Sequence, residues 1–311
     1  MSTPRPPIRA LLIDISGTLH VGSQPVPGAV HALSLLRYNR LPDGSRISSS
    51  KPVPFRFCSN TSKESRNELE ARLRGMSFEL RSDTRNSAAG DGREMWTSLG
   101  AVSGLLQKRG LRNPFCLLEP SPKDEIFRDL GPSSEGTWAS DSEYDSVVVG
   151  LAPSLLTYEH LNTAFRILLS SKPKPLIATH SAKYIRVAEP DPSKSEASHE
   201  TLSLGPGPFV AALETATGAR AEVVGKPSRA FFEMVIASFG EDEVCSDGKI
   251  TIIGDDIETD LGGGAVELGL WRVLVRTGKY RAGDENRSGV VPPDEVHDSF
   301  AAFVESLLGG S

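Results

Sequence analysis

Four short segments of the chain share one pattern, in which an apolar, strand-like run ends in polar side chains. The first segment ends in a carboxylate and a serine, and the last ends in carboxylates. The second ends in hydrogen-bond donors and the third in a lysine. These residues are Asp14 and Ser16, Ser59 and Asn60, Lys226, and Asp255 with Asp256 and Asp260. In an open parallel sheet, ligands bind outside the carboxyl ends of the strands, so all four clusters are expected to line one crevice.

The chemistry of these side chains points to a phosphoryl group held beside a divalent cation. Asp14 and Asp255 are hard oxygen donors, which suit Mg²⁺ because it prefers a few carboxylates together with waters and phosphate oxygens. Ser59, Asn60 and Lys226 supply hydrogen-bond donors and a positive charge, which stabilise phosphate oxygens. A carboxylate in such a site can also attack phosphorus and form an aspartyl-phosphate. The pattern therefore predicts Mg²⁺-dependent phosphoryl chemistry, with Asp14 as a candidate nucleophile.

Short apolar runs alternate with helical spacings and predict the elements that position these residues. Several of the runs are continuous, which is typical of strands buried on both faces of a parallel sheet. The predicted strands are Ile8–Ile13, Val53–Cys58, Phe115–Leu118, Ser146–Leu151, Pro175–Ala178, Ala221–Val224, Ile250–Ile253 and Arg272–Val275. The segment from Thr61 to Glu64 has the form of a capping box, so a helix is expected to begin there. Strand–helix alternation at both ends of the chain predicts a doubly wound α/β fold.

The positions of the motifs predict two nested domains. Residues 1–93 and 205–311 contain all four motifs and form the expected core, a Rossmann-like parallel sheet. Residues 94–204 have their own strands and helices but none of the motifs, so they are expected to form an inserted α/β domain. Three polar segments without an apolar period are expected to be loops, namely 39–52, 81–92 and 189–200.

Composition excludes several classes of protein. The chain has 311 residues with 34 Lys and Arg against 40 Asp and Glu, a formal net charge of -6, and no basic stripe for nucleic acid or an anionic membrane. No apolar run approaches the ~18–20 residues that span a bilayer. The cysteines Cys58, Cys116 and Cys245 lack disulfide or metal spacing, which fits a reducing compartment. We therefore expect no nucleic-acid or membrane partner and a cytoplasmic location, with access to the nucleus left open.

Taken in order, the four motifs resemble those of the haloacid dehalogenase-like hydrolase superfamily. The insertion between the second and third motifs is similar to that of the subfamily with the larger, C2-type cap domain, called type IIA. The resemblance covers nearly the whole chain except the three polar loops. It implies that Asp14 is the nucleophile of a phosphatase and that Ser59 and Lys226 bind the phosphate. By analogy it also suggests a homodimer.

The same resemblance implies a metal site for Mg²⁺. Asp14 and Asp255 would be ligands through their side chains, and Ser16 would be the remaining protein ligand through its backbone carbonyl. Asp260 matches the acidic residue that supports the metal site. Asp256 has two possible roles, and the sequence does not decide between them. It caps the start of a helix, or it supports the metal site.

Ser16 departs from the pattern of the superfamily. Most of its phosphatases carry an aspartate at this position, two residues after the nucleophile, where it acts as general acid and then as base. A serine hydroxyl cannot protonate an alkoxide leaving group efficiently at neutral pH, and losing such help typically costs about 10²–10⁴ in rate. We therefore expect three classes of compound to be better substrates than alkyl phosphates. These are phosphoramidates (among them phospho-amino acids), pyrophosphate and aryl phosphates. In each case the expected partner is a small phosphorylated molecule.

Two other functions fit the same residues. A pseudophosphatase, which binds phosphorylated ligands with little or no turnover, is favoured by Ser16 and opposed by the intact Asp14, Lys226 and Asp255. Phosphoryl transfer to an acceptor other than water differs only in what attacks the aspartyl-phosphate, so the sequence does not separate it from hydrolysis. Metal-dependent turnover of a chromogenic aryl phosphate would distinguish an enzyme from a binding protein.

Overall fold

The chain folds into two compact units, each built around its own parallel sheet. The computed structural model describes residues 4–40, 45, 52–81, 93–131, 140–189, 199–240 and 247–309. Unit 1 comprises Met1–Ser59, Glu70–Trp96 and Pro227–Ser311, and unit 2 comprises Asn60–Leu69 and Thr97–Lys226. Most of unit 2 is therefore one long insertion in the sequence of unit 1.

Unit 1 contains a six-stranded sheet, and the strands of the first, second and fourth motifs lie side by side at its centre, whereas the strand of the third motif belongs to unit 2. From one edge to the other its strands are β14 (Glu295–His297), β13 (Trp271–Val275), β12 (Lys249–Gly254), β1 (Ile8–Asp14), β4 (Phe55–Ser59) and β5 (Met95–Thr97). β1 is parallel to both of its neighbours, β12 and β4. Ala10–Ile13 and Ile252–Ile253 are fully buried, as expected for central strands covered on both faces. Because β1 and β12 are parallel neighbours, the residues that follow them leave the sheet at the same edge.

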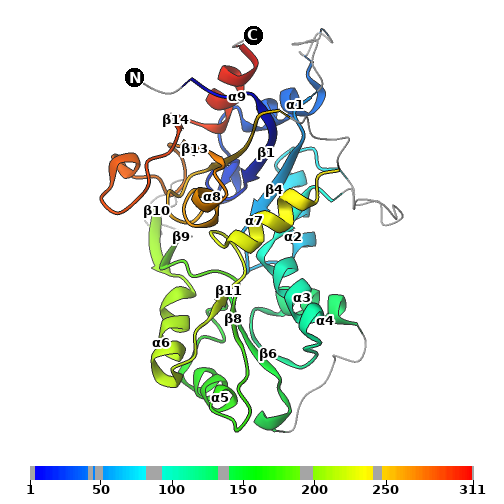
Figure 1. The fold of residues 1–311 in the computed structure, drawn as a ribbon, viewed down its shortest axis with the longest axis vertical. Coiled ribbons are helices and arrows are strands. Elements are labelled where there is room, and N and C mark those ends of the chain that lie inside the picture. Colours follow the sequence, from blue (N-terminus) through cyan, green and yellow to red (C-terminus); the bar gives the residue numbers. More distant parts are fainter. Residues whose placement is uncertain are drawn as a thin grey trace. The chain divides into compact units, whose positions relative to one another are not determined.

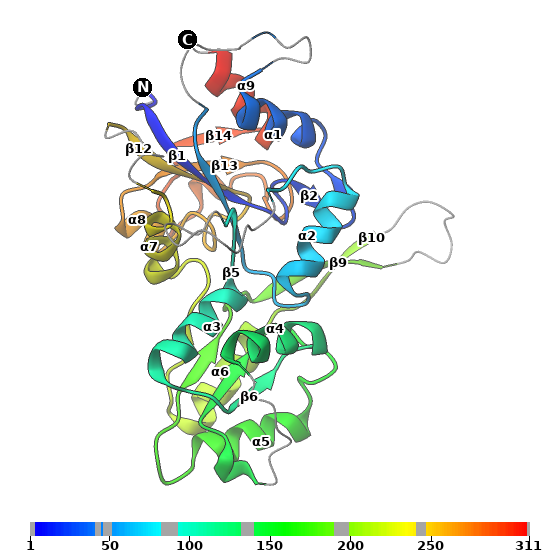
Figure 2. The ribbon, with the colours of Figure 1, turned by 90° about the vertical axis from the view of Figure 1, so that its right-hand side faces the viewer.

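Helices cover both faces of this sheet (Figures 1 and 2). On one face α1 (Ala29–Tyr38) packs against α9 (Phe300–Gly309), and on the other α7 (Arg229–Ala237) packs against α8 (Gly264–Glu267). The order of the strands is that of a doubly wound fold. The chain builds the sheet outward in one direction from β1, then returns to the other side of β1 with β12 and continues in the opposite direction. The predicted fold class is confirmed.

Unit 2 has a smaller α/β structure. Its sheet has the order β11 (Glu222–Val223), β8 (Leu176–Ala178), β7 (Ser146–Val149) and β6 (Pro114–Leu117), with all pairs parallel. Its helices are α3 (Ser98–Arg109), α4 (Pro120–Leu130), α5 (Tyr158–Leu168) and α6 (Gly207–Thr217). α5 packs against α6 and β7, and Val147, Ile167 and Leu213 are among the buried residues of this core.

The end of the insertion lies later in the chain than the sequence analysis placed it. The predicted boundary follows residue 204, whereas the structure groups the chain up to Lys226 with unit 2. The reason is pairing and packing: β11 joins β8 in the sheet of unit 2, and α6 buries Val210 and Leu213 in the same core. The short strand that leads to Lys226 is therefore part of the inserted unit.

Helix α2 (Arg66–Gly75) also begins later than predicted. The capping box is formed by Ser65 and Glu68, where the Ser65 N–H donates to Glu68 Oε2 (2.9 Å) and the Glu68 N–H donates to Ser65 Oγ (3.4 Å). The expected box that starts at Thr61 does not form, because Ser62 Oγ accepts the N–H of Leu151 (2.9 Å) and holds this stretch outside the helix. Both tetrads fit the capping pattern, and tertiary contacts decide between them.

All eight predicted strands are present, with limits within two residues of those predicted. The structure adds strands that are very short or lie beside polar segments, together with two single 3₁₀ turns. These are β2 (His20–Val21), β3 (Gln24–Pro25), β5, β9 (Tyr184–Glu189), β10 (His199–Leu204), β14, Asp141–Glu143 and Asp284–Asn286. The three predicted loops lie almost entirely outside the described residues, apart from their ends.

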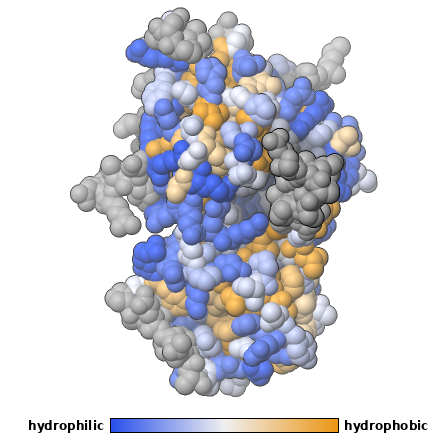
Figure 3. Space-filling model, turned by 180° about the vertical axis from the view of Figure 1, so that it is seen from behind, coloured by the Kyte–Doolittle hydropathy of each residue, from blue (hydrophilic) through white to orange (hydrophobic). Residues whose placement is uncertain are grey.

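Among the described residues, no helix has the length and apolar character that crossing a membrane requires. The face drawn in Figure 3 carries hydrophilic and hydrophobic residues side by side. Large apolar side chains that are more than half exposed are Tyr38, Tyr158, Leu169, Leu202, Leu204 and Val291. They come from several different elements of the two units.

Candidate active site

Three carboxylates meet at the carboxyl edge of the unit 1 sheet. Asp14 is the last residue of β1, and Asp255 directly follows β12. Asp14, Asp255 and Asp260 are 5%, 2% and 3% exposed, respectively. One carboxylate oxygen from each lies within 4.8 Å of the other two. Because buried like charges at this spacing repel one another, the arrangement favours a bound cation.

Asp260 reaches the cluster because the chain turns back after β12. The Asp260 N–H donates to the carbonyl oxygen of Asp256 (2.9 Å), and the Asp256 N–H donates to Asp260 Oδ2 (3.1 Å). A Cβ atom at Gly254 would lie 2.4 Å from the Cβ of Asp260. Glycine at the end of β12 is therefore what lets the Asp260 side chain fold back over the strand.

Two further glycines make room for the carboxylate of Asp255. A Cβ atom would lie 2.0 Å from Asp255 Oδ2 at Gly17 and 2.1 Å from it at Gly278. Both glycines have positive φ angles, 99° and 54°, which glycine adopts without strain. The backbone N–H of Lys279 donates to the same Oδ2 (2.6 Å) and fixes the orientation of the carboxylate. This all-oxygen set of donors in a close-fitting cradle suits Mg²⁺.

The electrostatics of the cluster show the same need for a cation. Burial raises the pKa of Asp255 well above its usual value, and the charges of Asp14 and Asp260 raise it further. Burial opposes the charged form of Lys279, but the surrounding carboxylates, above all Asp256, outweigh that effect and raise its pKa. Lys279 is therefore a charged ammonium beside the carboxylates, and it compensates only part of their charge.

Asp256 caps the turn that carries Asp260. Its Oδ1 accepts the N–H groups of Glu258 and Thr259, both at 3.0 Å, and its Oδ2 accepts from Lys279 Nζ at 3.4 Å. Burial raises the pKa of Asp256, but Lys279 and the two backbone N–H groups outweigh burial and leave it below its usual value. Capping, one of the two roles left open by the sequence, is therefore present. A part in supporting the metal stays a prediction.

The segment after Asp14 forms a tight loop. Thr18 Oγ1 donates to Asp14 Oδ2 (3.1 Å) and orients the carboxylate, and the Gly17 N–H donates to the carbonyl oxygen of His20 (2.7 Å). Ser16 is exposed, whereas the residues on either side of it are buried. Its side chain is therefore accessible to small molecules, and its role as a metal ligand through the backbone carbonyl stays a prediction.

The predicted phosphate-binding residues are divided between the units. Ser59 ends β4, the neighbour of β1, and is 1% exposed. In unit 2, Asn60 Nδ2 donates to the carbonyl oxygen of Lys226, and the Lys226 N–H donates to Asn60 Oδ1, both at 2.9 Å. The structure thus gives Asn60 a positioning role on the Lys226 backbone. Contact of Asn60, Ser59 or Lys226 with phosphate stays a prediction.

The sequence analysis missed the residues that follow β13. Thr277 Oγ1 donates to the carbonyl oxygen of Gly17 (2.5 Å), while Gly278 and Lys279 contact Asp255 as described above. This segment follows the same rule as the four motifs, since a buried strand ends in polar residues. The signal was therefore available, because β13 was among the predicted strands.

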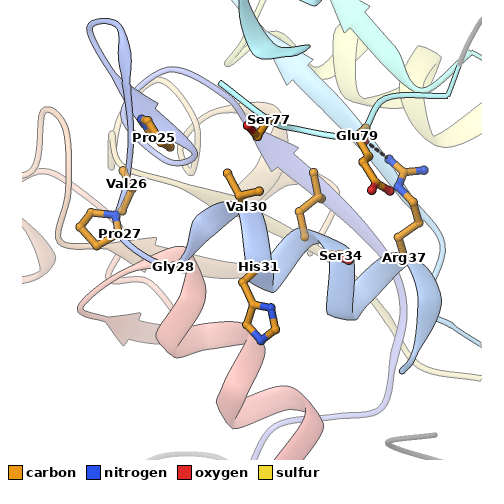
Figure 4. Close-up of a pocket in the computed structure, with 11 residues that line it drawn as sticks. Pro25, Val26, Pro27, Gly28, Val30, His31, Ser34, Arg37, Ser77 and Glu79 are labelled. Atoms are coloured by element: carbon orange, nitrogen blue, oxygen red, sulfur yellow. Dashed lines mark hydrogen bonds between the residues drawn. The ribbon is translucent and has the colours of Figure 1, made fainter. Parts of the chain in front are cut away.

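A surface cavity of about 560 Å³ lies elsewhere on unit 1 (Figure 4). It is formed by the segment before α1, by α1 itself and by the chain near Ser77 and Glu79. Its guanidinium, Arg37, is bound to Glu94 and to the carbonyl oxygen of Glu79. None of the predicted site residues lines it, so the cavity is separate from the carboxylate cluster.

The doubly wound fold thus carries a buried carboxylate cluster at the carboxyl ends of two neighbouring central strands, β1 and β12. Sequence profiles described as haloacid dehalogenase-like hydrolase and HAD-hydrolase-like match residues 11–131 and 223–303, respectively. The chain belongs to the haloacid dehalogenase-like hydrolase family, as its motifs predicted.

Two curated relatives extend over nearly the whole chain. Human haloacid dehalogenase-like hydrolase domain-containing protein 2 is 38% identical over 301 residues, covering 97% of this chain and 96% of the relative. Human phospholysine phosphohistidine inorganic pyrophosphate phosphatase is 31% identical over 305 residues, covering 97% and 94%. The resemblance predicted from the motifs is confirmed, and the chain is an enzyme of the hydrolase class.

Solved structures share the fold at lower identity. A 4-nitrophenylphosphatase from Thermotoga maritima matches with a TM-score of 0.70 and 23% identity, covering 96% of this chain and 97% of its own. A glycerol phosphate phosphatase from Mycobacterium tuberculosis, in complex with magnesium, matches with a TM-score of 0.69 and 23% identity, covering 95% and 76%. These matches support the same two-part α/β architecture.

Proposed function

We propose that the chain is a Mg²⁺-dependent phosphatase that uses Asp14 as its nucleophile. The observation that carries this proposal is the set of oxygens from Asp14, Asp255 and Asp260, which lie within 4.8 Å of one another. Asp14 attacks phosphorus, the leaving group departs with the electron pair of the broken bond, and an aspartyl-phosphate remains. Water then attacks that phosphorus and releases inorganic phosphate together with the free carboxylate.

The metal-binding residues in this proposal are Asp14, Asp255 and the backbone carbonyl of Ser16, with Asp260 in support. When bound, Mg²⁺ would screen the negative charge between the carboxylates and the incoming phosphate. Thr18 keeps the Asp14 carboxylate oriented through its hydrogen bond at 3.1 Å. This contact holds one oxygen in place and favours attack by the other.

Ser59 and Lys226 are the proposed phosphate-binding residues. Lys226 is 1% exposed, and its backbone is held by two hydrogen bonds, one donated by the Asn60 side chain and one accepted by it. A lysine that is ordered before substrate arrives stabilises developing negative charge without a reorganisation cost.

Ser16 sets the proposed preference for leaving groups. Because it cannot act as a general acid, leaving groups that need little protonation are favoured over alkoxides. One relative is named for phospholysine, phosphohistidine and inorganic pyrophosphate, substrates whose leaving groups meet that condition. We propose the same substrate classes, together with aryl phosphates, for this chain.

Ser16 also favours the second candidate, a pseudophosphatase that binds phosphorylated ligands. A protein kept for binding alone does not need the oriented nucleophile, Asp14, so we place hydrolysis first. Both functions imply a small phosphorylated partner. The homodimer and the cytoplasmic location stay predictions.

A substrate panel tests the proposal. The purified chain is assayed with a phosphoramidate, pyrophosphate, 4-nitrophenyl phosphate and glycerol phosphate, each with Mg²⁺ and with EDTA. The proposal expects Mg²⁺-dependent turnover of the first three and at least about tenfold slower turnover of glycerol phosphate. Equal turnover of glycerol phosphate would refute the leaving-group preference, and binding without turnover of any substrate would favour the pseudophosphatase.

A further inference from the structure

The segment Thr277–Lys279 is built into the carboxylate site by three contacts. Thr277 Oγ1 donates to the carbonyl oxygen of Gly17 (2.5 Å). The space that a side chain would fill at Gly278 is taken by Asp255, whose Oδ2 would lie 2.1 Å from an added Cβ. The Lys279 N–H then donates to that same Oδ2 (2.6 Å). The backbone of Lys279 is therefore fixed relative to Asp255.

The Lys279 side chain adds a positive charge at this fixed point. Its ammonium lies 3.4 Å from Asp256 Oδ2, and 29% of the side chain is exposed. Asp256 also accepts two backbone N–H groups, so the carboxylate that binds the ammonium is itself held by the turn.

The ammonium does not balance the charge of the cluster. Asp14, Asp255 and Asp260 are each at most 5% exposed, and the Lys279 ammonium lies 3.4 Å from the carboxylate of Asp256, the residue that follows Asp255. The positive charge of Lys279 therefore lies beside a group of buried carboxylates. It attracts anions and repels cations that approach the same place.

We propose that Lys279 is a positioning residue that tunes the site in two opposite ways, weakening Mg²⁺ binding and strengthening phosphate binding. The inference rests on the proposed function and deepens it. The backbone of Lys279 orients Asp255, while its ammonium reduces the negative potential of the carboxylates. The metal then binds less tightly than the carboxylates alone would allow, and a phosphate meets less repulsion.

The test measures both affinities on the full-length chain. Mg²⁺ binding is followed by isothermal titration calorimetry at constant ionic strength, and phosphate binding is measured as the inhibition constant of inorganic phosphate with saturating Mg²⁺. The variant Lys279→Met removes the charge but keeps the backbone N–H that binds Asp255. We expect it to bind Mg²⁺ about tenfold more tightly and phosphate several-fold more weakly.

Two variants serve as controls, and a third is a substitute for the test variant. Lys279→Arg keeps the positive charge and is expected to keep both affinities within about twofold of the wild type. Lys108→Met removes a lysine from the exposed face of α3 in unit 2 and is expected to change neither affinity. Lys279→Gln replaces Lys279→Met if the methionine variant does not fold, as judged by circular dichroism.

The outcomes separate this inference from the proposed function. Tighter Mg²⁺ binding together with weaker phosphate binding supports the role of Lys279. A different result would refute the inference and leave the proposed metal site standing. In that case the wild type binds Mg²⁺ and Asp255→Asn does not, but a folded Lys279→Met variant binds Mg²⁺ with unchanged or lower affinity. If the wild type binds no Mg²⁺, the proposed function and the inference both fail.

Discussion

Asn60 and Lys226 are joined by two hydrogen bonds that run in opposite directions, both 2.9 Å long. The side-chain amide of Asn60 donates to the carbonyl oxygen of Lys226 and accepts from its N–H. Gly225, the residue before Lys226, has no room for a side chain, since an added Cβ would lie 2.5 Å from Asn60 Oδ1. The lysine is thus held in place through its main chain.

Substituting Asn60 by alanine is therefore expected to displace Lys226. Losing two hydrogen bonds lowers the free energy of unfolding by about 2 kcal/mol, and a misplaced lysine lowers kcat/KM by about 10- to 100-fold. Urea denaturation and steady-state kinetics measure the two effects. Asn67→Ala on the exposed face of α2 is the matched control and is expected to alter neither. A fully active Asn60→Ala variant would contradict the positioning role.

Substituting Asp255 by asparagine is expected to stabilise the metal-free protein. The change removes one of three buried carboxylates that repel one another, while the amide oxygen can still accept the N–H of Lys279. Differential scanning calorimetry in EDTA should show a melting temperature several degrees above that of the wild type, and added Mg²⁺ should no longer raise it. A lower melting temperature in EDTA would show that the cluster is not under repulsion. Asp124→Asn on α4, an exposed position, is the control.

The difference in stability between the wild type and Asp255→Asn is expected to depend on pH, and the sign of this dependence follows from the pKa of Asp255. Burial, followed by Asp14 and Asp260, raises the pKa of Asp255, so the folded state binds this proton more tightly than the unfolded state. The wild type therefore loses stability relative to Asp255→Asn as the pH rises from about 4, the pKa of an unfolded aspartate, through the higher pKa of the folded state. Because Mg²⁺ binds the deprotonated carboxylate, stabilisation of the wild type by Mg²⁺ should grow over the same range. Melting curves at a series of pH values measure both trends, and a pH-independent difference would contradict them.

Substituting Gly278 by alanine is expected to abolish tight metal binding. The new Cβ would lie 2.1 Å from Asp255 Oδ2, at a φ of 54° that alanine resists. Gly110, at a φ of 66° with nothing within 4 Å of an added Cβ, is the matched control, because alanine there adds only the backbone strain of a left-handed residue, about 1–2 kcal/mol. Calorimetry should show Mg²⁺ affinity reduced more than about tenfold in Gly278→Ala and unchanged in Gly110→Ala. Equal affinities in the two variants would show that the cradle does not matter.

Substituting Ser16 by aspartate is expected to restore a general acid. The position is exposed, so a carboxylate fits without burial. Turnover of glycerol phosphate should rise by about tenfold or more, whereas turnover of a phosphoramidate should change little, since its leaving group needs little help. If both rates rise equally or neither changes, Ser16 does not set the leaving-group preference.

Much of the site could be predicted because its residues follow strands. Asp14 and Asp255 come directly after buried apolar runs, and the carboxyl ends of neighbouring parallel strands lie at one edge of a sheet. That rule needs no knowledge of side-chain contacts. The rule also applies to Thr277, which follows an equally clear strand, so the sequence contained the signal for this residue.

Other features depend on contacts that no local pattern encodes. Thr277 binds Gly17 across 260 positions of sequence, and Asn60 binds Lys226 across 166. The sequence before α2 fits two capping patterns. The choice between them depends on a tertiary contact, in which the Leu151 N–H donates to Ser62 Oγ. The end of the insertion likewise depends on the pairing of β11, a strand of two residues. Each of these required the tertiary structure.

The most direct test of the central claim is to trap the phosphorylated enzyme. The chain is mixed with pyrophosphate or 4-nitrophenyl phosphate and Mg²⁺, quenched in acid within milliseconds, and digested for peptide mass spectrometry. The account predicts a phosphate adduct on the Asp14 carboxylate of the wild type in Mg²⁺ and no adduct in EDTA. The Asp14→Asn variant should form no adduct and should be inactive, whereas the control Asp124→Asn should form the adduct normally. Turnover by Asp14→Asn at the wild-type rate, with no adduct on Asp14 in the wild type, would contradict the proposed mechanism.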